Sequence, residues 1–283
     1  MSTKEKVVVN IKKMKTAYTH AGVLHADDVF SAAFLRILNP NIKIIRVNDV
    51  PHMGKNEFAF DIGRGEFDHH QPDVAVRRSG TKFAAFGLLW KKFGRDTGLN
   101  SVSCSLMDKE FIEELDAADN GQGHSAMAGT IAGFNPEWNE PKSQDDAFWD
   151  AVTFATEILK RRIAHYKAME LAVSFVEDAA KHSEDERIVV MDKFAPWRHI
   201  LIPSAACFVV FPSKRGGYAA QVVPEGFNTQ KAKVNFPTEW WGADEGQLPS
   251  GITFCHPSGF LISAKTLEAA MHACEEALKG EKA

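Results

Sequence analysis

The stretch Asp61-Ile-Gly-Arg-Gly-Glu-Phe-Asp68-His69-His70 follows a short apolar run at residues 58–60. This run predicts a strand that ends at Asp61, and the two glycines permit a tight turn because glycine accepts positive φ at little cost. We expect residues 66–68 to return as a second extended run, so that a hairpin carries Asp68, His69 and His70 beside Asp61. Carboxylate and imidazole groups are the usual oxygen and nitrogen donors for divalent metals. The stretch therefore predicts a metal site.

A second cluster of the same residue types lies upstream. An extended run at residues 15–20 ends at His20, and a turn leads to His25, Asp27 and Asp28 at the start of an apolar helix expected over residues 29–38. Acidic side chains at a helix start also favour the helix dipole. Taken alone, this spacing is equally typical of a helix cap with two scattered histidines.

A third acidic element, Asp116-Ala-Ala-Asp119, ends a helix expected over residues 106–118. On its own, an acid such as Asp119 is more often a surface or capping residue. Three acid and histidine clusters at element ends within about one hundred residues nevertheless favour a dinuclear metal centre over unrelated polar positions.

The order of the expected elements indicates an α/β fold. Runs at residues 15–20, 42–47 and 58–60 predict strands that alternate with a helix, as in a parallel sheet, where ligands gather at the carboxyl ends of strands. Apolar residues at three-, four- and seven-residue steps then predict a long amphipathic helix, and short strands with a last helix follow. We expect a parallel-sheet metal-binding domain at 15–135, a connecting helix at 146–182 and a smaller α+β domain at 187–283.

Composition limits the class of protein. With 283 residues and 45% hydrophobic content the chain can form two domains, and its net charge of −4 argues against a protein that coats nucleic acid through bulk charge. The 4 cysteines form no C-x-x-C pair. We find no secretory signal at the N-terminus and no apolar run near the ~20 residues of a membrane helix. A soluble cytoplasmic protein is expected, and its oligomeric state, a homodimer included, stays open.

These residues resemble the motifs of the DHH phosphoesterases, and more closely those of the Myg-type (melanocyte proliferating gene) family of metal-dependent 3′–5′ exoribonucleases. The resemblance covers nearly the whole chain. It implies a DHH-type N-terminal domain, a smaller substrate-binding C-terminal domain, and RNA or a short oligonucleotide as substrate. The stretches that carry it are Thr19–Asp28, Phe60–Gln71, Asp116–Gly121, Phe236–Trp240 and His256–Phe260.

The resemblance also implies roles for individual residues. One metal would take His20, His25 and a bridging Asp61, and the other would take Asp27, Asp61, His69 and Asp119, with Asp116 as the alternative to Asp119. His25 stands near a position where the superfamily has a carboxylate, and a neutral imidazole there shifts the preference from Mg²⁺ toward Mn²⁺, with Zn²⁺ as a further option. His70 would donate to a phosphate oxygen, and Asp68 would orient a ligand imidazole.

A separate cluster near the C-terminus, His256-Pro-Ser258-Gly259-Phe260 followed by Lys265, suits an anion. Ser258, the Gly259 backbone and a helix N-terminus are expected to bind substrate phosphate across a cleft between the domains, with Lys265 adding a charge. The same pattern is typical of an ordinary strand, turn and helix, and it is the resemblance that favours the binding role.

The expected reaction follows from a dinuclear Mn²⁺ site. Two such ions lower the pKa of a shared water, and the resulting hydroxide attacks phosphorus in line. We therefore expect a metal-dependent phosphodiesterase, and the resemblance implies more specifically a 3′–5′ exoribonuclease. One alternative is a hydrolase of small phosphoesters or short oligonucleotides, because a long RNA usually requires a basic track. The other is a non-catalytic metal-binding interaction protein.

Overall fold

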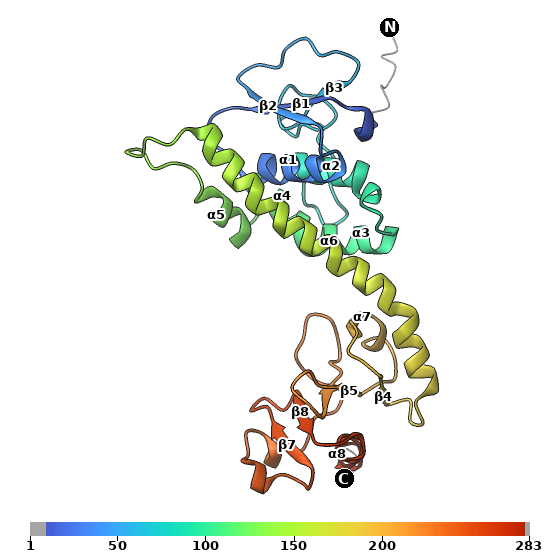
Figure 1. Ribbon diagram of the computed structural model, residues 1–283. Coiled ribbons are helices and arrows are strands. Elements are labelled where there is room, and N and C mark those ends of the chain that lie inside the picture. Colours follow the sequence, from blue (N-terminus) through green and yellow to red (C-terminus); the bar gives the residue numbers. More distant parts are fainter. Residues whose placement is uncertain (1–9, 281–283) are drawn as a thin grey trace. The chain divides into compact units, whose positions relative to one another are not determined.

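The computed structural model describes residues 10–280, so residues 1–9, where no secretory signal is expected, and residues 281–283 lie outside the described part. The chain divides into two compact units, residues 1–167 and 168–283, and each is described by itself (Figure 1). The division falls within helix α6 (Gln144–His182), the long helix that the sequence predicts over 146–182. No helix of the described residues combines the length and apolar character needed to cross a membrane.

A small parallel sheet and helix α1 form the framework of the first unit. Strand β1 (Thr16–His20) lies between β2 (Lys43–Val47) and β3 (Glu57–Ala59) and pairs with both in parallel. Helix α1 (Ala26–Leu38) connects β1 to β2, and every residue from 26 to 35 is buried, which explains why this segment is apolar almost all round. The parallel α/β sheet expected from the sequence is confirmed. The carboxyl ends of β1 and β3 therefore meet at one edge.

Helices cover this framework and build its core. They are α2 (Ala85–Phe93), α3 (Ser101–Met107), α4 (Glu113–Asp119) and α5 (Ala126–Ala132). The helix predicted over 106–118 is confirmed as part of a continuous helical segment, but one turn of it, Asp108–Ile112, is π-helical. This turn places Phe111 edge-on against Phe30 of α1, with ring centroids 5.3 Å apart. Such a long-range contact leaves no periodic signal in the sequence.

The second unit contains a five-stranded sheet, with the order β4-β5-β6-β8-β7. Its strands are β4 (Ile188–Val190), β5 (Phe208–Pro212), β6 (Tyr218–Val222), β7 (Ile252–Cys255) and β8 (Leu261–Ala264). Only β4 and β5 pair in parallel. Alternate residues along β5 serve two cores: Phe208 and Val210 face the one that includes helix α8 (Leu267–Gly280), and Val209 and Phe211 face the one that includes the C-terminal part of α6. The expected α+β character is confirmed. The sequence predicts strands at 188–191, 206–211, 218–223 and 252–255 and a last helix from about Lys265, but no strand at β8.

Candidate metal centre

Strand β1 and helix α1 present the first group of side chains. β1 ends at His20, and α1 begins at Ala26, so Asp27 and Asp28 lie in its first turn, where both are fully buried. Asp28 Oδ1 accepts a hydrogen bond of 2.8 Å from the His25 backbone N–H. The Asp28 carboxylate therefore caps the start of α1 and fixes the end of the segment that connects β1 to this helix.

Asp27 is held by a different element. Its two carboxylate oxygens accept hydrogen bonds from the backbone N–H groups of Ala85 and Phe86, at 2.9 and 2.7 Å. These are the first residues of α2, whose N-terminal amides have no partner within the helix. The helix end thus fixes the orientation of this buried carboxylate and offsets part of its charge.

The loop at residues 61–70 presents the second group, and its geometry differs from the predicted hairpin. Phe60 and Phe67 form an isolated bridge of parallel orientation. Positive φ angles occur at Asp61 (54°), Gly63 (86°) and Arg64 (55°), and not at the second glycine. The hairpin prediction is wrong because the chain bends at these three residues and returns to the sheet edge through a compact loop.

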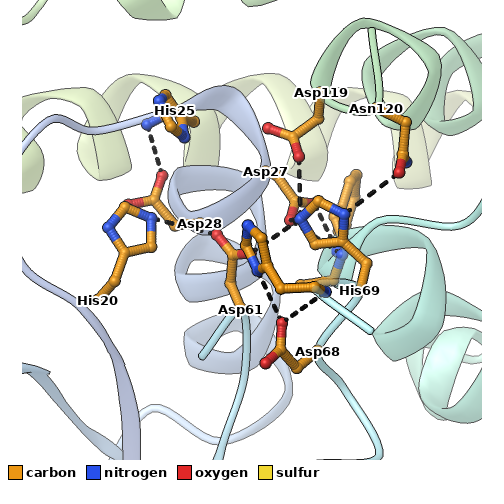
Figure 2. Close-up of polar contacts among 12 residues, drawn as sticks. His20, His25, Asp27, Asp28, Asp61, Asp68, His69, Asp119 and Asn120 are labelled. Atoms are coloured by element: carbon orange, nitrogen blue, oxygen red, sulfur yellow. Dashed lines mark hydrogen bonds and ion pairs between the residues drawn. The ribbon is translucent and has the colours of Figure 1, made fainter. Parts of the chain in front are cut away.

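The two groups meet at Asp61, as Figure 2 shows. Asp61 Oδ2 lies 3.2 Å from His20 Nε2, and Asp61 Oδ1 lies 3.1 Å from His69 Nε2. His69 Nε2 is in turn 3.0 Å from Asp119 Oδ2 and 4.0 Å from Asp27 Oδ2. One carboxylate therefore stands between two imidazoles and their acidic neighbours, which is the position a bridging ligand would occupy.

Two overlapping sets of donors are close enough to hold metal ions. Asp61, His69 and His70 form one, and Asp27, His69 and Asp119 form the other, with the donor atoms of each set within 4.8 Å of one another. Asp28 Oδ2, Asp61 Oδ1 and His69 Nε2 are buried without a hydrogen-bond partner, although the last two lie 3.1 Å apart. Buried polar atoms without hydrogen bonds are costly. Divalent cations bound at this centre would offer these atoms a partner, so the residues fit a metal.

The crowded carboxylates shift the pKa values of the site. Burial lowers the pKa of His20 and His69, but Asp61 and, for His69, Asp119 outweigh it and raise these values to about 9 and about 11. Burial raises the pKa of Asp28 to about 7 and, with repulsion from Asp61, also raises that of Asp27. Without a bound cation, the centre therefore keeps protons that offset its carboxylates.

Asp68 contacts His70, and through it the centre. Its Oδ1 accepts a hydrogen bond from the His70 backbone N–H at 3.0 Å and lies 2.8 Å from His70 Nδ1, while its Oδ2 accepts from the Arg64 backbone N–H at 2.5 Å. His70 Nδ1 is 3.6 Å from Asp61 Oδ1, and its side chain is 60% exposed. The expected orienting role of Asp68 thus concerns His70, whereas His69 has a different partner.

That partner is Asn120, to which the sequence analysis gives no role. Asn120 Oδ1 lies 3.3 Å from His69 Nδ1, so it can fix the imidazole while Nε2 faces the carboxylates. Asp116 lies elsewhere: its carboxylate is buried 2.7 Å from the Arg77 guanidinium. This geometry favours Asp119 over Asp116 as a ligand. The signal for Asn120 was its position directly after Asp119.

His25 belongs to the wall of a cavity of about 330 Å³ rather than to either donor set. Its ring centroid is 5.6 Å from that of His20. The cavity is lined by His20, His25, Asp61, Ile62, Gly63, Arg64, Asp68 and His70. It is the space through which a small group could reach Asp61.

The residues predicted to bind phosphate lie in the second unit. His256 Nδ1 is 2.8 Å from Ser258 Oγ and accepts the Ser258 backbone N–H at 3.1 Å. A Cβ at Gly259 would lie 2.2 Å from the Trp241 ring, so close packing against this ring explains why the position is glycine. Lys265 Nζ is 3.0 Å from Glu245 Oε1.

The helix expected from about Lys265 begins close to that position, but a strand that the sequence does not predict separates it from Ser258 and Gly259. After Gly259 the chain forms β8, and α8 begins only at Leu267. Ser258 and Gly259 therefore lie in a turn between β7 and β8, and not at the start of α8. Lys265 alone is close to the helix start.

The comparisons with known proteins match one family over most of the chain. The family model MYG1_exonuc, described as an uncharacterised protein family (UPF0160), matches residues 16–278. The MYG1 protein YER156C of Saccharomyces cerevisiae is 27% identical, over 95% of this chain and 97% of that protein. The MYG1 exonuclease of Homo sapiens is 27% identical over 89% of this chain and 83% of that protein, and the one of Mus musculus is 28% identical over 90% and 82%. No solved structure matches.

Proposed function

The chain belongs to the MYG1 exonuclease family, and from this premise we propose that it is a metal-dependent nuclease that removes nucleotides from the 3′ end of RNA with two Mn²⁺ ions. Relatives from human and mouse carry the name exonuclease. The observation that carries the metal dependence is Asp61, whose two oxygens face His20 and His69 at 3.2 and 3.1 Å. The motifs at residues 19–28, 60–71 and 116–121 support the proposal that the chain is related to the DHH phosphoesterases.

We assign the ligands by position around Asp61. His20 and Asp61 would hold one ion, and we propose that His25 reaches this ion from the cavity wall beside His20. His69, Asp27 and Asp119 would hold the other, again with Asp61. Asp28 adds a buried carboxylate 3.5 Å from His20 Nε2, so it is available to the first ion as well. Imidazole and carboxylate ligands in this mixture suit Mn²⁺.

The ions, when bound, would activate water and neutralise the phosphoryl oxygens. The protein's own contribution is positioning. Asn120 and the N-terminus of α2 orient His69 and Asp27, as described above. Asp68 holds His70 with its ring at the cavity, and we propose that His70 donates a hydrogen bond to a phosphate oxygen as negative charge develops. In the second unit, Ser258, Gly259 and Lys265 are proposed as a further contact to substrate phosphate.

One observation favours a narrower substrate. The cavity beside Asp61 measures about 330 Å³, at the small end of ligand pockets, and it is lined by acids as well as histidines. A hydrolase of short oligonucleotides or small phosphoesters is therefore the second candidate function.

Both candidates are tested with the purified full chain. RNA ladders of two to thirty nucleotides, labelled at either end, would be incubated with Mn²⁺, Mg²⁺ or Zn²⁺, beside small phosphodiesters. Stepwise shortening of 5′-labelled RNA supports 3′–5′ exonuclease action, and cleavage of only the shortest substrates supports the second candidate.

Matched variants test the site. Asp61→Asn should lose metal and activity together, while the exposed Asp96→Asn should keep both. His70→Ala should keep both ions and lower kcat by ~10²–10³-fold, the usual loss for one transition-state donor. Metal binding without any turnover on these substrates would instead support a non-catalytic protein.

A further inference from the structure

The cavity beside Asp61 contains one side chain to which the proposed metal chemistry gives no role. Arg64 lines this cavity together with His20, Asp61 and His70. It is exposed, and no carboxylate of the part of the chain that the structure describes forms an ion pair with its guanidinium. It is also the only arginine or lysine among the lining residues. A permanent positive charge thus stands at the cavity without a protein partner.

The backbone at Arg64 is held in a conformation that arginine rarely adopts. Asp61 and Arg64 are the two non-glycine residues with positive φ among residues 10–280, at 54° and 55°. Aspartate tolerates this region better than a long side chain does, so the larger cost falls on Arg64. Such outliers persist where the surroundings impose them, and they cluster at ligand clamps.

The surroundings impose this conformation from two sides. The Arg64 backbone N–H donates to Asp68 Oδ2 at 2.5 Å. Its neighbour Gly63 packs so closely against Val50 that a Cβ at position 63 would lie 2.7 Å from Val50 Cγ2. The start of the Arg64 side chain is therefore fixed at the cavity wall, although glycine at position 64 would make the turn without strain.

The net charge of the centre with two metal ions bound explains why a positive side chain at position 64 would assist the binding of an anion. Five carboxylates belong to the centre and its cavity wall: Asp27, Asp28, Asp61, Asp68 and Asp119. Two divalent ions supply four positive charges, so a negative charge remains before a phosphodiester, itself an anion, enters. A guanidinium offsets this charge, and its planar fork matches two phosphoryl oxygens.

We propose that Arg64 binds the phosphate group of the substrate at the entrance to the centre and positions it against Asp61 and its ions. This inference rests on the proposed function and adds a residue that selects for a phosphate-bearing ligand. Arg64 acts by holding an oxygen pair of the phosphate in place, and no proton or bond change is assigned to it.

The test compares Arg64→Gln, Arg64→Lys and Arg64→Gly with the exposed control Arg78→Gln, all in the Mn²⁺-loaded full chain. Binding of orthophosphate and of adenosine monophosphate is measured by calorimetry, hydrolysis of a dinucleotide by kinetics, and thermal stability by Tm. A charge-assisted bidentate contact is expected to be worth about 10- to 100-fold in affinity. Arg64→Gln should raise Kd and KM by this factor, Arg64→Lys by less, and Arg78→Gln by nothing.

Arg64→Gly separates a ligand role from a structural one. It should weaken phosphate binding as much as Arg64→Gln while keeping metal content, and its Tm should stay equal or rise because glycine relieves the positive φ. A lower Tm with loss of metal, or unchanged Kd and KM in Arg64→Gln, would overturn the inference. If the wild-type protein cleaves no phosphodiester yet binds orthophosphate through Arg64, the proposed function fails and the phosphate site stands.

Discussion

Metal loading should release protons, and the number follows from the two histidines that flank Asp61. An imidazole nitrogen binds a metal only when it is neutral, yet the pKa values of His20 and His69 are raised to about 9 and about 11 in the metal-free protein. Below pH ~9 both rings therefore carry a proton that the ions must displace. The sign is definite: rising pH removes the competing protons and strengthens metal binding.

The magnitude is set by the proton count. Each displaced proton changes the overall binding constant tenfold per pH unit, so two protons give about 100-fold, or ~2.7 kcal/mol, per unit. This slope should hold between pH ~7 and ~9. Below pH ~7 it should become steeper, because the pKa of Asp28 is raised to about 7 and its carboxyl then also carries a proton.

Calorimetry with Mn²⁺ in two buffers of different ionisation enthalpy measures the protons released directly, and repeating it across pH gives the slope. At pH 8 we expect at least two protons per chain. His69→Gln should reduce this number by about one, while the exposed His124→Gln should leave it unchanged. Release of fewer than one proton would refute the assignment of both histidines as ligands.

Three further predictions concern residues outside the proposed ligand set. Gly87→Ala would put a Cβ 1.8 Å from a carboxylate oxygen of buried Asp116, so it should lower the free energy of unfolding by ~3–5 kcal/mol in a denaturant titration, as breaking a buried ion pair does. Asn135→Ala removes both hydrogen bonds that its amide makes with the Leu24 backbone, at 3.0 and 2.9 Å; it should cost ~1–3 kcal/mol by the same titration and weaken Mn²⁺ binding, since Leu24 adjoins a proposed ligand. Lys265→Ala should raise KM and flatten its salt dependence without changing metal content or Tm.

Matched controls separate these effects from general damage. Gly129→Ala meets no atom within 4 Å and should be neutral or slightly stabilising in the same titration. Lys231→Ala, at another exposed lysine of the second unit, should leave KM unchanged. An Asn135→Ala protein with unaltered Mn²⁺ affinity would show that the loop it anchors does not support the centre, and a Gly87→Ala protein of normal stability would contradict the packing argument.

The framework of the centre could be predicted because local signals specify it. Predicted strands end at His20 and Asp61, and parallel strands bring their carboxyl ends together, so two distant donors meet at one edge. The position of Asp27 and Asp28 at the start of α1 could be predicted from the apolar helix pattern that follows them. Distance in the chain is no obstacle where strand pairing sets the register.

The rest depends on contacts that leave no pattern. Arg77 forms an ion pair with Asp116, which gives this carboxylate a different partner from Asp119. Nothing in the order of residues predicts this pairing. The positive φ of Arg64 is imposed by Asp68 and Val50, and the glycines nearby suggested a different turn. The sequence predicts no strand at Leu261–Ala264 because this segment is short and lies between a turn and a helix, so the strand that separates Ser258 from α8 is not anticipated.

The bonds from Asp27 to the first amides of α2 affect how variants of this protein should be interpreted. A mutation at Asp27 removes a proposed ligand and also uncaps a helix whose start is buried, with Ala85 and Phe86 inside the core. Inactivity caused by misfolding and inactivity caused by metal loss would then look alike in a cell. Asp119 makes no such bond in the described structure and is 13% exposed. In a genetic test of the site, an inactive allele that still accumulates normally is therefore better sought at Asp119 than at Asp27.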